Sequence, residues 1–564
     1  MAPHLVVHKE QSRGQELMRL LKCVESTTVS LVHEADQTVP VTKRLNLPNN
    51  EPPKPLSSPN SIGHLQSLEQ LQAGICKPLP ADGLGEEGFY QAISFLSRHS
   101  VNTSSFGFMD KLYSAPSPPG IAADLFLSIL NNNSHVWHVS PALSTVEKHV
   151  ASQLARLFGI GGENVGGITV PGGAAGNMLA MLVARNILAP EIKKHGCLER
   201  QRYAIFTSEA SHYSIANAAQ ILGLGSNAVI TIPTTSNGSM DIDSLELAVD
   251  QALGSGMKPL FIAATAGTTV RGAFDPLEEV GRIAKKVNAW YHVDGCWGGA
   301  AVFSDELRNR LAGAELADSI SFNPHKLLGV PLVCSFLLAK DLRTFWLANK
   351  LEAGYLFHDT KTQGESSGTA SAASIEAPIM IPSTSPLELG TPSRRDWRKS
   401  EALENAPPAS KILDLASLTT QCGRRPDASK FYLHWIYYGI KGMASDVEKA
   451  VTSARYLASL VDRSPYLTLV GDVHVPFAQV CFYWKAKSAF KGTLQDRAVI
   501  NSRTTHQLSS HLVTRGWMID YAPGTNTDGQ EGDFLRVVCN RLTDEDVVEA
   551  LLGEIIRVGI ELDL

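Results

Sequence analysis

Paired cysteines are scarce in this chain. Its 564 residues include eight cysteines, and no two of them form a CxxC pair. Scattered cysteines argue against a zinc site and against a disulfide framework. We therefore expect reduced thiols and no bound metal.

Long apolar runs and an excess of basic charge are also missing. No run reaches the roughly 18–20 apolar residues that a membrane span needs, and Met1 to Glu10 lacks the apolar core of a secretory signal. The formal net charge of −6 leaves no basic face for nucleic acid. We expect neither a membrane nor a nucleic-acid partner, and a cytoplasmic location.

What the chain does contain is an alternation of strand and helix signals between about residues 151 and 340. This pattern is typical of a parallel sheet covered by helices on both faces, and it predicts an α/β fold. Further along, Phe431 to Leu460 predicts a long helix. Tyr466 to Trp484 and Phe534 to Cys539 predict strands of a smaller C-terminal domain.

These signals divide the chain into five parts. An N-terminal extension with a linker, in which Gln15 to Val24 predicts an amphipathic helix, occupies residues 1–83, and a helical segment occupies residues 84–150. Residues 359–410 predict a disordered insertion, since Ser, Thr, Pro, Ala and Gly dominate and cannot bury enough apolar area to offset the entropy of ordering. The large domain spans residues 151–358, and the remainder with the small domain spans residues 411–564.

Two motifs carry chemistry. His292-Val-Asp-Gly-Cys-Trp-Gly-Gly places Asp294 after an apolar strand signal, and Asn323-Pro-His-Lys places Lys326 after another. Open α/β sheets bind their ligands at such strand ends. A lysine amine can form a Schiff base with an aldehyde cofactor, and a carboxylate beside a pyridine nitrogen favours the protonated ring, which then acts as an electron sink. The pair indicates pyridoxal 5'-phosphate chemistry.

A third motif, Pro171-Gly-Gly-Ala-Ala-Gly-Asn177, follows a strand signal and begins a helix signal. Backbone N–H groups at a helix N-terminus bind phosphate. The motif therefore predicts a phosphate cradle.

Together with Ser208–Ser214, Gly267–Pro276 and Gln421–Arg425, these motifs resemble, in order and spacing, those of the group II pyridoxal-phosphate-dependent amino acid decarboxylases, of the glutamate and cysteine-sulfinate decarboxylase kind. The resemblance runs from about Leu84 to Leu564. It implies the aspartate aminotransferase-like fold type I, with a mostly parallel seven-stranded sheet in the large domain, a small C-terminal α/β domain, and a homodimer with active sites at its interface.

The resemblance also implies roles for individual residues. Those it makes catalytic are Lys326, which carries the cofactor, Asp294 at the ring nitrogen, and His212, which stacks on the ring. Further cofactor-binding residues are Gly173, Ala174, Asn177, Thr268, Asn323 and His325. The residues implied for the substrate are Arg536, at its carboxylate, and Trp137, near its side chain.

The function implied is decarboxylation of an L-amino acid to the amine, through a Schiff base and a quinonoid intermediate. Family members usually protonate the product carbon with a loop tyrosine, yet this chain has no tyrosine between Tyr355 and Tyr432. Decarboxylation-dependent oxidative deamination to an aldehyde, carbon–carbon bond formation and a non-catalytic partner subunit therefore stay open as alternatives. The sequence leaves the substrate open between an acidic and an aromatic or aliphatic L-amino acid.

Overall fold

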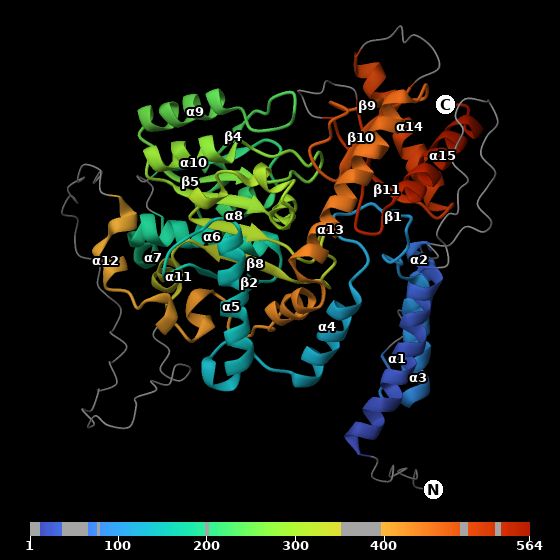
Figure 1. Ribbon diagram of the computed structural model, residues 1–564, viewed down its shortest axis with the longest axis horizontal. Coiled ribbons are helices and arrows are strands. Elements are labelled where there is room, and N and C mark those ends of the chain that lie inside the picture. The colour runs from blue at the N-terminus through green and yellow to red at the C-terminus, as the bar shows by residue number, and fades with distance from the viewer. Residues whose placement is uncertain are drawn as a thin grey trace.

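The chain forms a large domain, a small domain and a helical arm (Figure 1). The computed structural model describes residues 12–36, 62, 66–75, 79–197, 202–350, 396–485, 494–524 and 532–564. Of the linker predicted over residues 36–60, residues 37–60 lie outside the described residues and Asp36 is helical; residues 359–395 of the predicted insertion also lie outside them.

A seven-stranded sheet forms the centre of the large domain, in the order β2-β8-β7-β6-β5-β3-β4. Only β8 runs against its neighbours, so the predicted mostly parallel sheet is confirmed. Helices cover both faces of the sheet, and strands buried on both faces need continuous apolar runs. The strands are β2 (Gly166–Val170), β3 (Tyr203–Ser208), β4 (Val229–Ile232), β5 (Lys258–Thr265), β6 (Trp290–Gly295), β7 (Ser319–Phe322) and β8 (Ser335–Ala339).

Two apolar cores lie on the two faces of this sheet. The first lies under α5 (Pro141–Leu157), α9 (Ile242–Gly254), α10 (Leu277–Lys286) and η3 (Gly298–Phe303). The second lies under α6 (Gly173–Leu188), α7 (Pro190–His195), α8 (Ser214–Ile221), α11 (Leu342–Asn349) and η8 (Leu415–Leu418). Other short helices are η1 (Trp137–Val139), η2 (Ser226–Ala228), η4 (Arg308–Leu311), η5 (Ala314–Leu316) and η7 (Ala409–Lys411).

The small domain has a five-stranded sheet in the order β1-β11-β12-β10-β9. The sequence predicted β9 (Leu467–Leu469), β10 (Gln479–Trp484) and β12 (Phe534–Val538), and it missed β11 (Met518–Ala522) and β1 (Phe108–Met109). Strand β1 comes from the N-terminal helical segment and pairs in parallel with β11. Helices α14 (Leu494–Val513) and α15 (Glu545–Glu561) cover the sheet.

The predicted long helix is α13 (Ala428–Arg463), which contacts α4 (Pro118–Leu130) and α5 at one end and α15 at the other. It joins the two domains (Figure 1). Gly439 interrupts its helical backbone with a φ of 66°. This left-handed conformation favours glycine, which has no Cβ to clash.

The prediction of disorder up to residue 410 is wrong for residues 396–410. Trp397 begins η6 (Trp397–Lys399) and stacks on Trp290, with ring centroids 5.0 Å apart. Arg398 donates to the buried carboxylate of Asp318 at 2.6 Å. One aromatic anchor and one ion pair thus order a segment of otherwise loop-like composition, which then continues into α12 (Glu401–Glu404).

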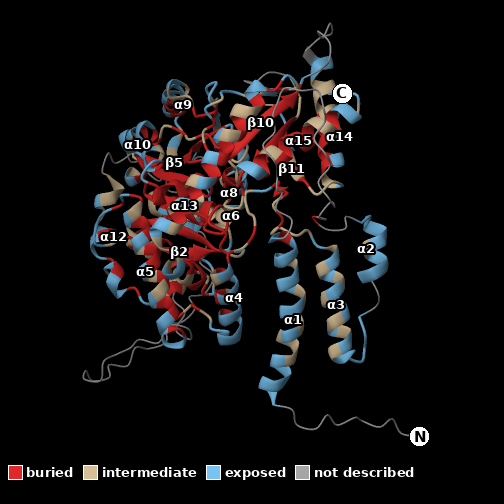
Figure 2. Ribbon diagram, turned by 45° about the vertical axis from the view of Figure 1, so that its right-hand side comes forward, coloured by how far each residue is buried: buried red, intermediate tan, exposed pale blue. Residues whose placement is uncertain are grey.

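The helical arm consists of α1 (Arg13–Asp36), α2 (Leu68–Ile75) and α3 (Gly85–His99). The predicted helix over Gln15 to Val24 is confirmed as part of α1. The arm projects from the body beside α4 (Pro118–Leu130) (Figure 1). Most residues of the arm are exposed, whereas each of the two domains has an interior of buried residues (Figure 2). Arg19 pairs with Glu86 between α1 and α3 at 2.6 Å.

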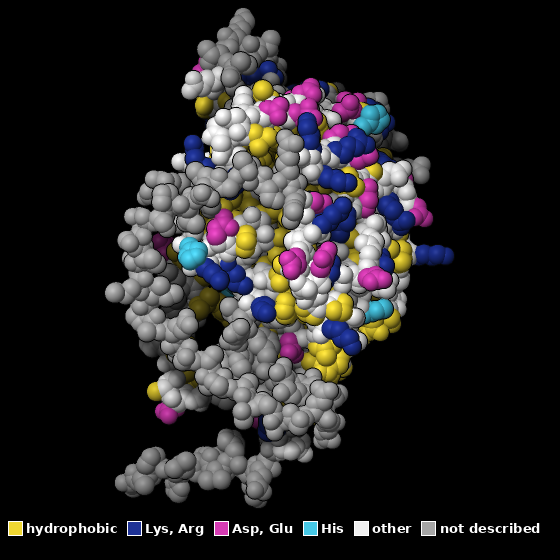
Figure 3. Space-filling view, turned by 90° about the vertical axis from the view of Figure 1, so that its left-hand side faces the viewer, with side chains coloured by type: hydrophobic (Ala, Val, Ile, Leu, Met, Phe, Trp, Pro, Cys, Tyr) yellow, Lys and Arg dark blue, Asp and Glu magenta, His cyan; other side chains and the backbone are white. Residues whose placement is uncertain are grey.

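Elsewhere the surface mixes charged side chains of both signs with exposed apolar ones. On the face shown in Figure 3, cationic and acidic side chains are interspersed wherever the described residues are visible. None of the helices in the described part of the chain is both long and apolar enough to cross a membrane.

Candidate active site

A cavity of about 230 Å³, called here the Lys326 cavity, opens at the carboxyl ends of the parallel strands. Asp294 lies near the end of β6, Lys326 follows β7, and His212 follows β3. Parallel strands present their carboxyl ends at one edge, which brings these distant residues together. The lining residues are Gly172, Gly173, Ala174, Asn177, His212, Thr265, Gly267, Thr269, Asp294, Cys296, Trp297, Asn323, His325 and Lys326.

All but one of the predicted cofactor-binding residues line this cavity. The exception is Thr268, whose hydroxyl accepts a hydrogen bond from the Ala273 backbone at 3.0 Å and so faces its own loop. Its neighbour Thr269 lines the cavity instead. The sequence could not choose between two adjacent threonines because the turn geometry decides which one faces inward.

The two predicted substrate residues lie outside the lining. Arg536, on β12, contacts the Asp520 carboxylate and donates to the Thr269 carbonyl at 2.9 Å, so it touches the wall of the cavity from behind. The backbone N–H of Trp137 donates to Asp414 at 2.7 Å.

Asp294 is buried and ionised. Burial alone would raise its pKa, but hydrogen bonding from Cys296, the charge of Lys326 and the amide of Asn177 together hold the pKa below its ordinary value. The Asn177 Nδ2 group donates to one carboxylate oxygen at 2.8 Å, and the Cys296 backbone N–H donates to the other at 3.1 Å. A fixed negative charge therefore faces the same cavity as the Lys326 amine.

Behind Asp294 lies a buried chain of hydrogen bonds whose direction can be assigned. Trp290 Nε1 donates to Ser319 Oγ at 2.8 Å, and Ser319 Oγ lies 2.9 Å from His292 Nδ1. His292 Nε2 lies 3.0 Å from the Asn177 side-chain oxygen, which can only accept. His292 therefore carries its proton on Nε2, and burial lowers the pKa of this histidine to about 4. Trp290, His292 and Asp294 occupy every second position of β6, so their side chains point to the same face of the sheet.

This chain of hydrogen bonds ends at His212. Asn177 Nδ2 also donates to Ser214 Oγ at 2.9 Å, and Ser214 Oγ lies 2.8 Å from His212 Nδ1. Since the Ser214 backbone N–H also points at His212 Nδ1, this nitrogen accepts. Burial lowers the pKa of His212, so the imidazole is neutral and carries its proton on Nε2. Asn177 thus orients the carboxylate and the histidine at once.

The cavity fits a phosphorylated ring. A side chain on Gly173 would meet Cys296 Sγ at 2.4 Å, so only glycine leaves the cradle open at the start of α6. The Asn323 side-chain oxygen is buried without a hydrogen-bond partner among the described residues. His325 faces the cavity, and its Nδ1 lies 2.7 Å from the Cys334 carbonyl. The helix N-terminus offers backbone N–H donors to a phosphate, and Lys326 and Asp294 in the same cavity suit the aldehyde and the ring nitrogen of pyridoxal phosphate.

Six lining residues were not predicted from the sequence, and two of them, Cys296 and Trp297, belong to the motif that contains Asp294. Cys296 and Trp297 line the cavity, and Trp297 Nε1 donates to Gln479 Oε1 at 2.8 Å. Gln479 Nε2 donates in turn to the carbonyls of Thr268 and Thr269 at 3.1 Å. The small domain thereby holds the loop that lines one side of the cavity. No local sequence signal identifies Gln479, since its partners lie about 180 to 210 residues away.

Comparison with known proteins agrees with this geometry. Residues 88–371 match the pyridoxal-dependent decarboxylase conserved domain. A glutamate decarboxylase-like protein of Gibberella zeae is 49% identical over 98% of this chain and 99% of its own length. An L-aspartate decarboxylase of Metarhizium robertsii is 37% identical over 98% of both chains.

Solved structures give the same answer for the fold. Mouse CSAD superposes with a TM-score of 0.78 at 26% identity, covering 97% of this chain and 99% of the mouse chain. The Oryza sativa protein named TDC, solved with pyridoxal phosphate and tryptamine, has a TM-score of 0.77 at 19% identity, covering 98% and 99% of the two chains. Its likeness shows the fold type I architecture alone.

The relatives favour decarboxylation over the alternatives that the missing tyrosine left open. The predicted cofactor is confirmed as well, because the matched domain is pyridoxal-dependent. The chain belongs to the pyridoxal-dependent decarboxylase family and is an amino acid decarboxylase that uses pyridoxal phosphate.

Proposed function

We propose that Lys326 holds the cofactor covalently, that Asp294 faces its ring nitrogen, and that His212 lies against its ring. The observation that carries the proposal is the ionised Asp294 carboxylate, buried and held by Asn177 in the same cavity as Lys326. When bound, pyridoxal phosphate supplies the electron sink that accepts the electrons of the broken carbon–carbon bond. The protein keeps the ring nitrogen protonated, orients His212 through Ser214, and binds the phosphate at the start of α6.

The attachment is tested by reducing the holoenzyme with borohydride and mapping the peptides. We expect the pyridoxyl group on Lys326, and we expect Lys326→Ala to lose both the label and turnover. A control variant, Lys340→Ala, removes an exposed amine that donates to the Glu315 carbonyl, and it should label normally. A label on any other lysine would overturn the assignment.

We propose further that the substrate is a short acidic L-amino acid, aspartate or glutamate. The support is the naming of the two relatives, one glutamate decarboxylase-like and one L-aspartate decarboxylase.

The test is incubation with aspartate, glutamate, tryptophan and leucine while carbon dioxide, amine, aldehyde and oxygen uptake are followed together. We expect equal amounts of carbon dioxide and amine from an acidic substrate, without oxygen uptake. Faster turnover of tryptophan or leucine would overturn the substrate proposal, and aldehyde with oxygen uptake would restore the alternative outcome.

A homodimer is the third part of the proposal. Helices α1, α2 and α3 bury almost nothing among the described residues, with Ala35 their one buried side chain. Isolated helices are marginal in water, and large exposed apolar patches mark contact surfaces. Apolar side chains exposed on the arm helices are Leu17, Met18, Val29, Val32, Leu68, Ile75, Phe89 and Leu96. A second copy of the chain would cover them by a two-fold arrangement. Sedimentation equilibrium should therefore give about twice the mass of one chain.

We also propose a cytoplasmic location, supported by the state of the thiols. All seven described cysteines are free. Such thiols persist in a reducing compartment. Fractionation of cells that express the tagged protein should recover it with the cytosol.

A further inference from the structure

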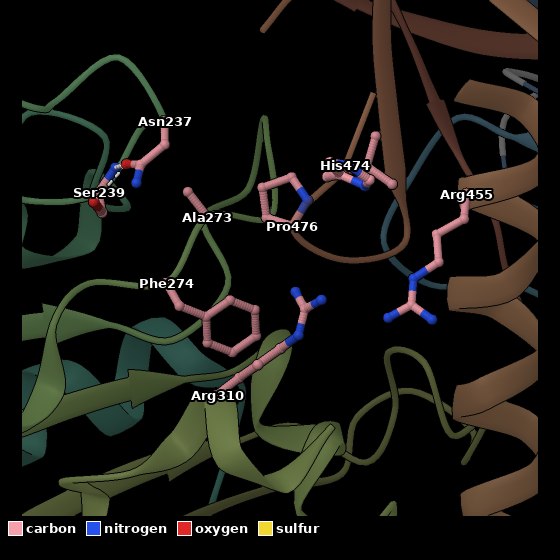
Figure 4. Close-up of a pocket in the computed structure, with 9 residues that line it drawn as sticks. Asn237, Ser239, Ala273, Phe274, Arg310, Arg455, His474 and Pro476 are labelled. Carbon is pink, nitrogen blue, oxygen red and sulfur yellow. Dashed lines mark hydrogen bonds between the residues drawn. The ribbon is translucent and has the colours of Figure 1, made fainter. Parts of the chain in front are cut away.

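A second cavity, called here the Arg310 cavity, lies between the two domains and has a volume of about 520 Å³. Asn237, Phe274 and Arg310 face it from the large domain (Figure 4). Arg455 faces it from α13, and His474 and Pro476 face it from the loop before β10. None of these residues lines the Lys326 cavity.

The charge of Arg310 is only weakly compensated. Its guanidinium lies 5.7 Å from the centroid of the Phe274 ring, and within the described parts of the chain no acceptor hydrogen-bonds to it. Burial and the nearby charge of Arg455 lower the pKa of Arg310, with Glu306 acting in the opposite sense. Figure 4 shows both guanidinium groups directed into the same space. Two like charges that share a cavity are an unfavourable arrangement, which an anion between them would relieve.

Neutral donors complete the lining. The Asn237 side-chain oxygen already accepts hydrogen bonds from Ser239 and Thr235, which leaves its amide group as the donor directed into the cavity (Figure 4). On the acidic side, Glu306 occupies one edge of Arg455 through a contact of 2.7 Å to Nη1. The second edge of that guanidinium stays available for a bidentate contact.

We propose that the Arg310 cavity binds a small oxyanion with two negative charges, such as a phosphate monoester or a dicarboxylate. Planar guanidinium groups bind both kinds of oxyanion through paired N–H groups. The bound anion contacts Arg310 on the large domain and Arg455 on α13, so it bridges the two parts of the molecule. Asn237 supplies a third donor, and the Phe274 ring packs against the carbon skeleton of an organic ligand.

The Arg310 cavity and the Lys326 cavity share a wall. Phe274 lines the first and meets Phe477 edge-on, with centroids 5.6 Å apart. Phe477 meets Trp297 in the same way at 5.6 Å, and Trp297 lines the second. The segment Gly267–Pro276 also serves both, because Gly267 and Thr269 line the Lys326 cavity whereas Ala273 and Phe274 line the other. An occupied Arg310 cavity is therefore linked to the active site through two successive ring contacts, Phe274 to Phe477 and Phe477 to Trp297.

The experiment is calorimetric titration of the holoenzyme with inorganic phosphate and, separately, with succinate. We expect binding of at least one probe at one site per chain, and a loss of affinity of at least about tenfold in Arg310→Met and in Arg455→Met. The two probes separate a phosphate ligand from a dicarboxylate ligand. Thermal unfolding should also shift upward with the bound probe in the wild type, because a ligand that binds only the folded state stabilises it.

The matched control is Arg308→Met. Arg308 lies on the same short helix, η4, and pairs with Asp305 at 3.2 Å, outside the cavity lining. The Arg308→Met variant should bind the probe with the affinity of the wild type. Without probe, all three variants should keep the cofactor content, kcat and KM of the wild type, which separates this site from the phosphate cradle and from the substrate site.

Three outcomes would overturn the proposal: no binding of either probe at millimolar concentration, unchanged binding in both Arg310→Met and Arg455→Met, or equal weakening in Arg308→Met. Circular dichroism checks that each variant is folded. If Arg310→Met or Arg455→Met does not fold, the proposal is tested with the other variant and with Asn237→Ala, which loses the amide donor.

Discussion

Asp294 remains ionised at a buried position on the Lys326 cavity because its neighbours are arranged to donate to it. Asp294→Asn keeps the shape of the side chain and removes the charge. An opposite charge nearby shifts a pKa by about 1–3 units, and each unit is a factor of ten. We therefore expect a fall of about ten- to a thousandfold in kcat, with weaker cofactor binding measured by absorbance. Near-normal turnover would show that the ring nitrogen does not depend on this carboxylate.

Ser319 controls His292 from behind the active site. Ser319→Ala removes the acceptor of Trp290 and the donor to His292, so the chain that orients Asn177 loses its first members. We expect a loss of about 1–3 kcal/mol in the free energy of unfolding and weaker cofactor binding. Ser321→Ala is the control, since Ser321 is buried on the same strand and its hydroxyl has no partner among the described residues. Equal effects of the two changes would contradict an orienting role for Ser319.

His434 makes folding stability depend on pH. Burial lowers its pKa to about 4, below the 6.5 of an exposed histidine. Between these values the unfolded chain binds the proton and the folded chain does not, so stability is lost as the pH falls from 6.5 towards 4. Compared with His434→Gln, the wild type should lose on the order of 3 kcal/mol between pH 7 and pH 4. Denaturant unfolding at each pH measures the difference, and parallel curves would contradict it.

At the residue scale the sequence predicted those site residues whose positions are fixed by strand ends. Lys326, Asp294 and His212 meet because β7, β6 and β3 end at one edge of the sheet. The inward position of Thr269 depends on turn geometry, and the contact of Gln479 depends on the docking of the small domain. Period-two alternation over Trp290, His292 and Asp294 could have indicated the buried chain.

At the scale of elements, one buried ion pair ties α5 to β2. Arg424 contacts Glu147 and donates to the Ser134 carbonyl at 2.6 Å, and Glu147 accepts from the Thr169 backbone at 2.8 Å. Arg424→Met would leave the Glu147 carboxylate buried and unpaired, and we expect a loss of about 3–5 kcal/mol in unfolding free energy.

The neighbouring residue provides the control for this change. Arg425 pairs with Asp124 at 2.7 Å and is 43% exposed. An exposed pair contributes about 0–1 kcal/mol, so Arg425→Met should be nearly neutral in the same denaturant titration. Similar losses for the two variants would show that burial of the pair does not decide its importance.

Elements were predictable in proportion to their length. The long α13 and the seven-stranded sheet follow from sustained periodicity. Strand β1 has two residues and depends wholly on β11 for its hydrogen bonds, so no local pattern reveals it. Residues 396–410 were misjudged because their order comes from Trp290 and Asp318, which lie far away in the sequence.

At the scale of the whole molecule, the exposed apolar side chains of the arm predict assembly. Leu96→Asp places a charge on α3, where the leucine is 53% exposed, and it should shift the dimer towards monomer. Leu253→Asp is the control, because this leucine is 47% exposed on α9, at the opposite end of the molecule (Figure 1). Sedimentation velocity over a range of concentrations distinguishes the two. A monomeric wild type, or equal effects of both changes, would contradict the proposed interface.

Strand β1 also sets an order of events during synthesis. The strand partners of Phe108 and Met109 are Met518 and Ile519, which are made about 400 residues later. At about 5–20 residues per second, that interval lasts roughly 20 to 80 seconds. The seven strands of the large sheet are complete by residue 339, so they can pair during this time. Phe108 and Met109 therefore lack their strand partners while the large sheet can already pair, and the nascent chain must keep them from aggregating during this interval.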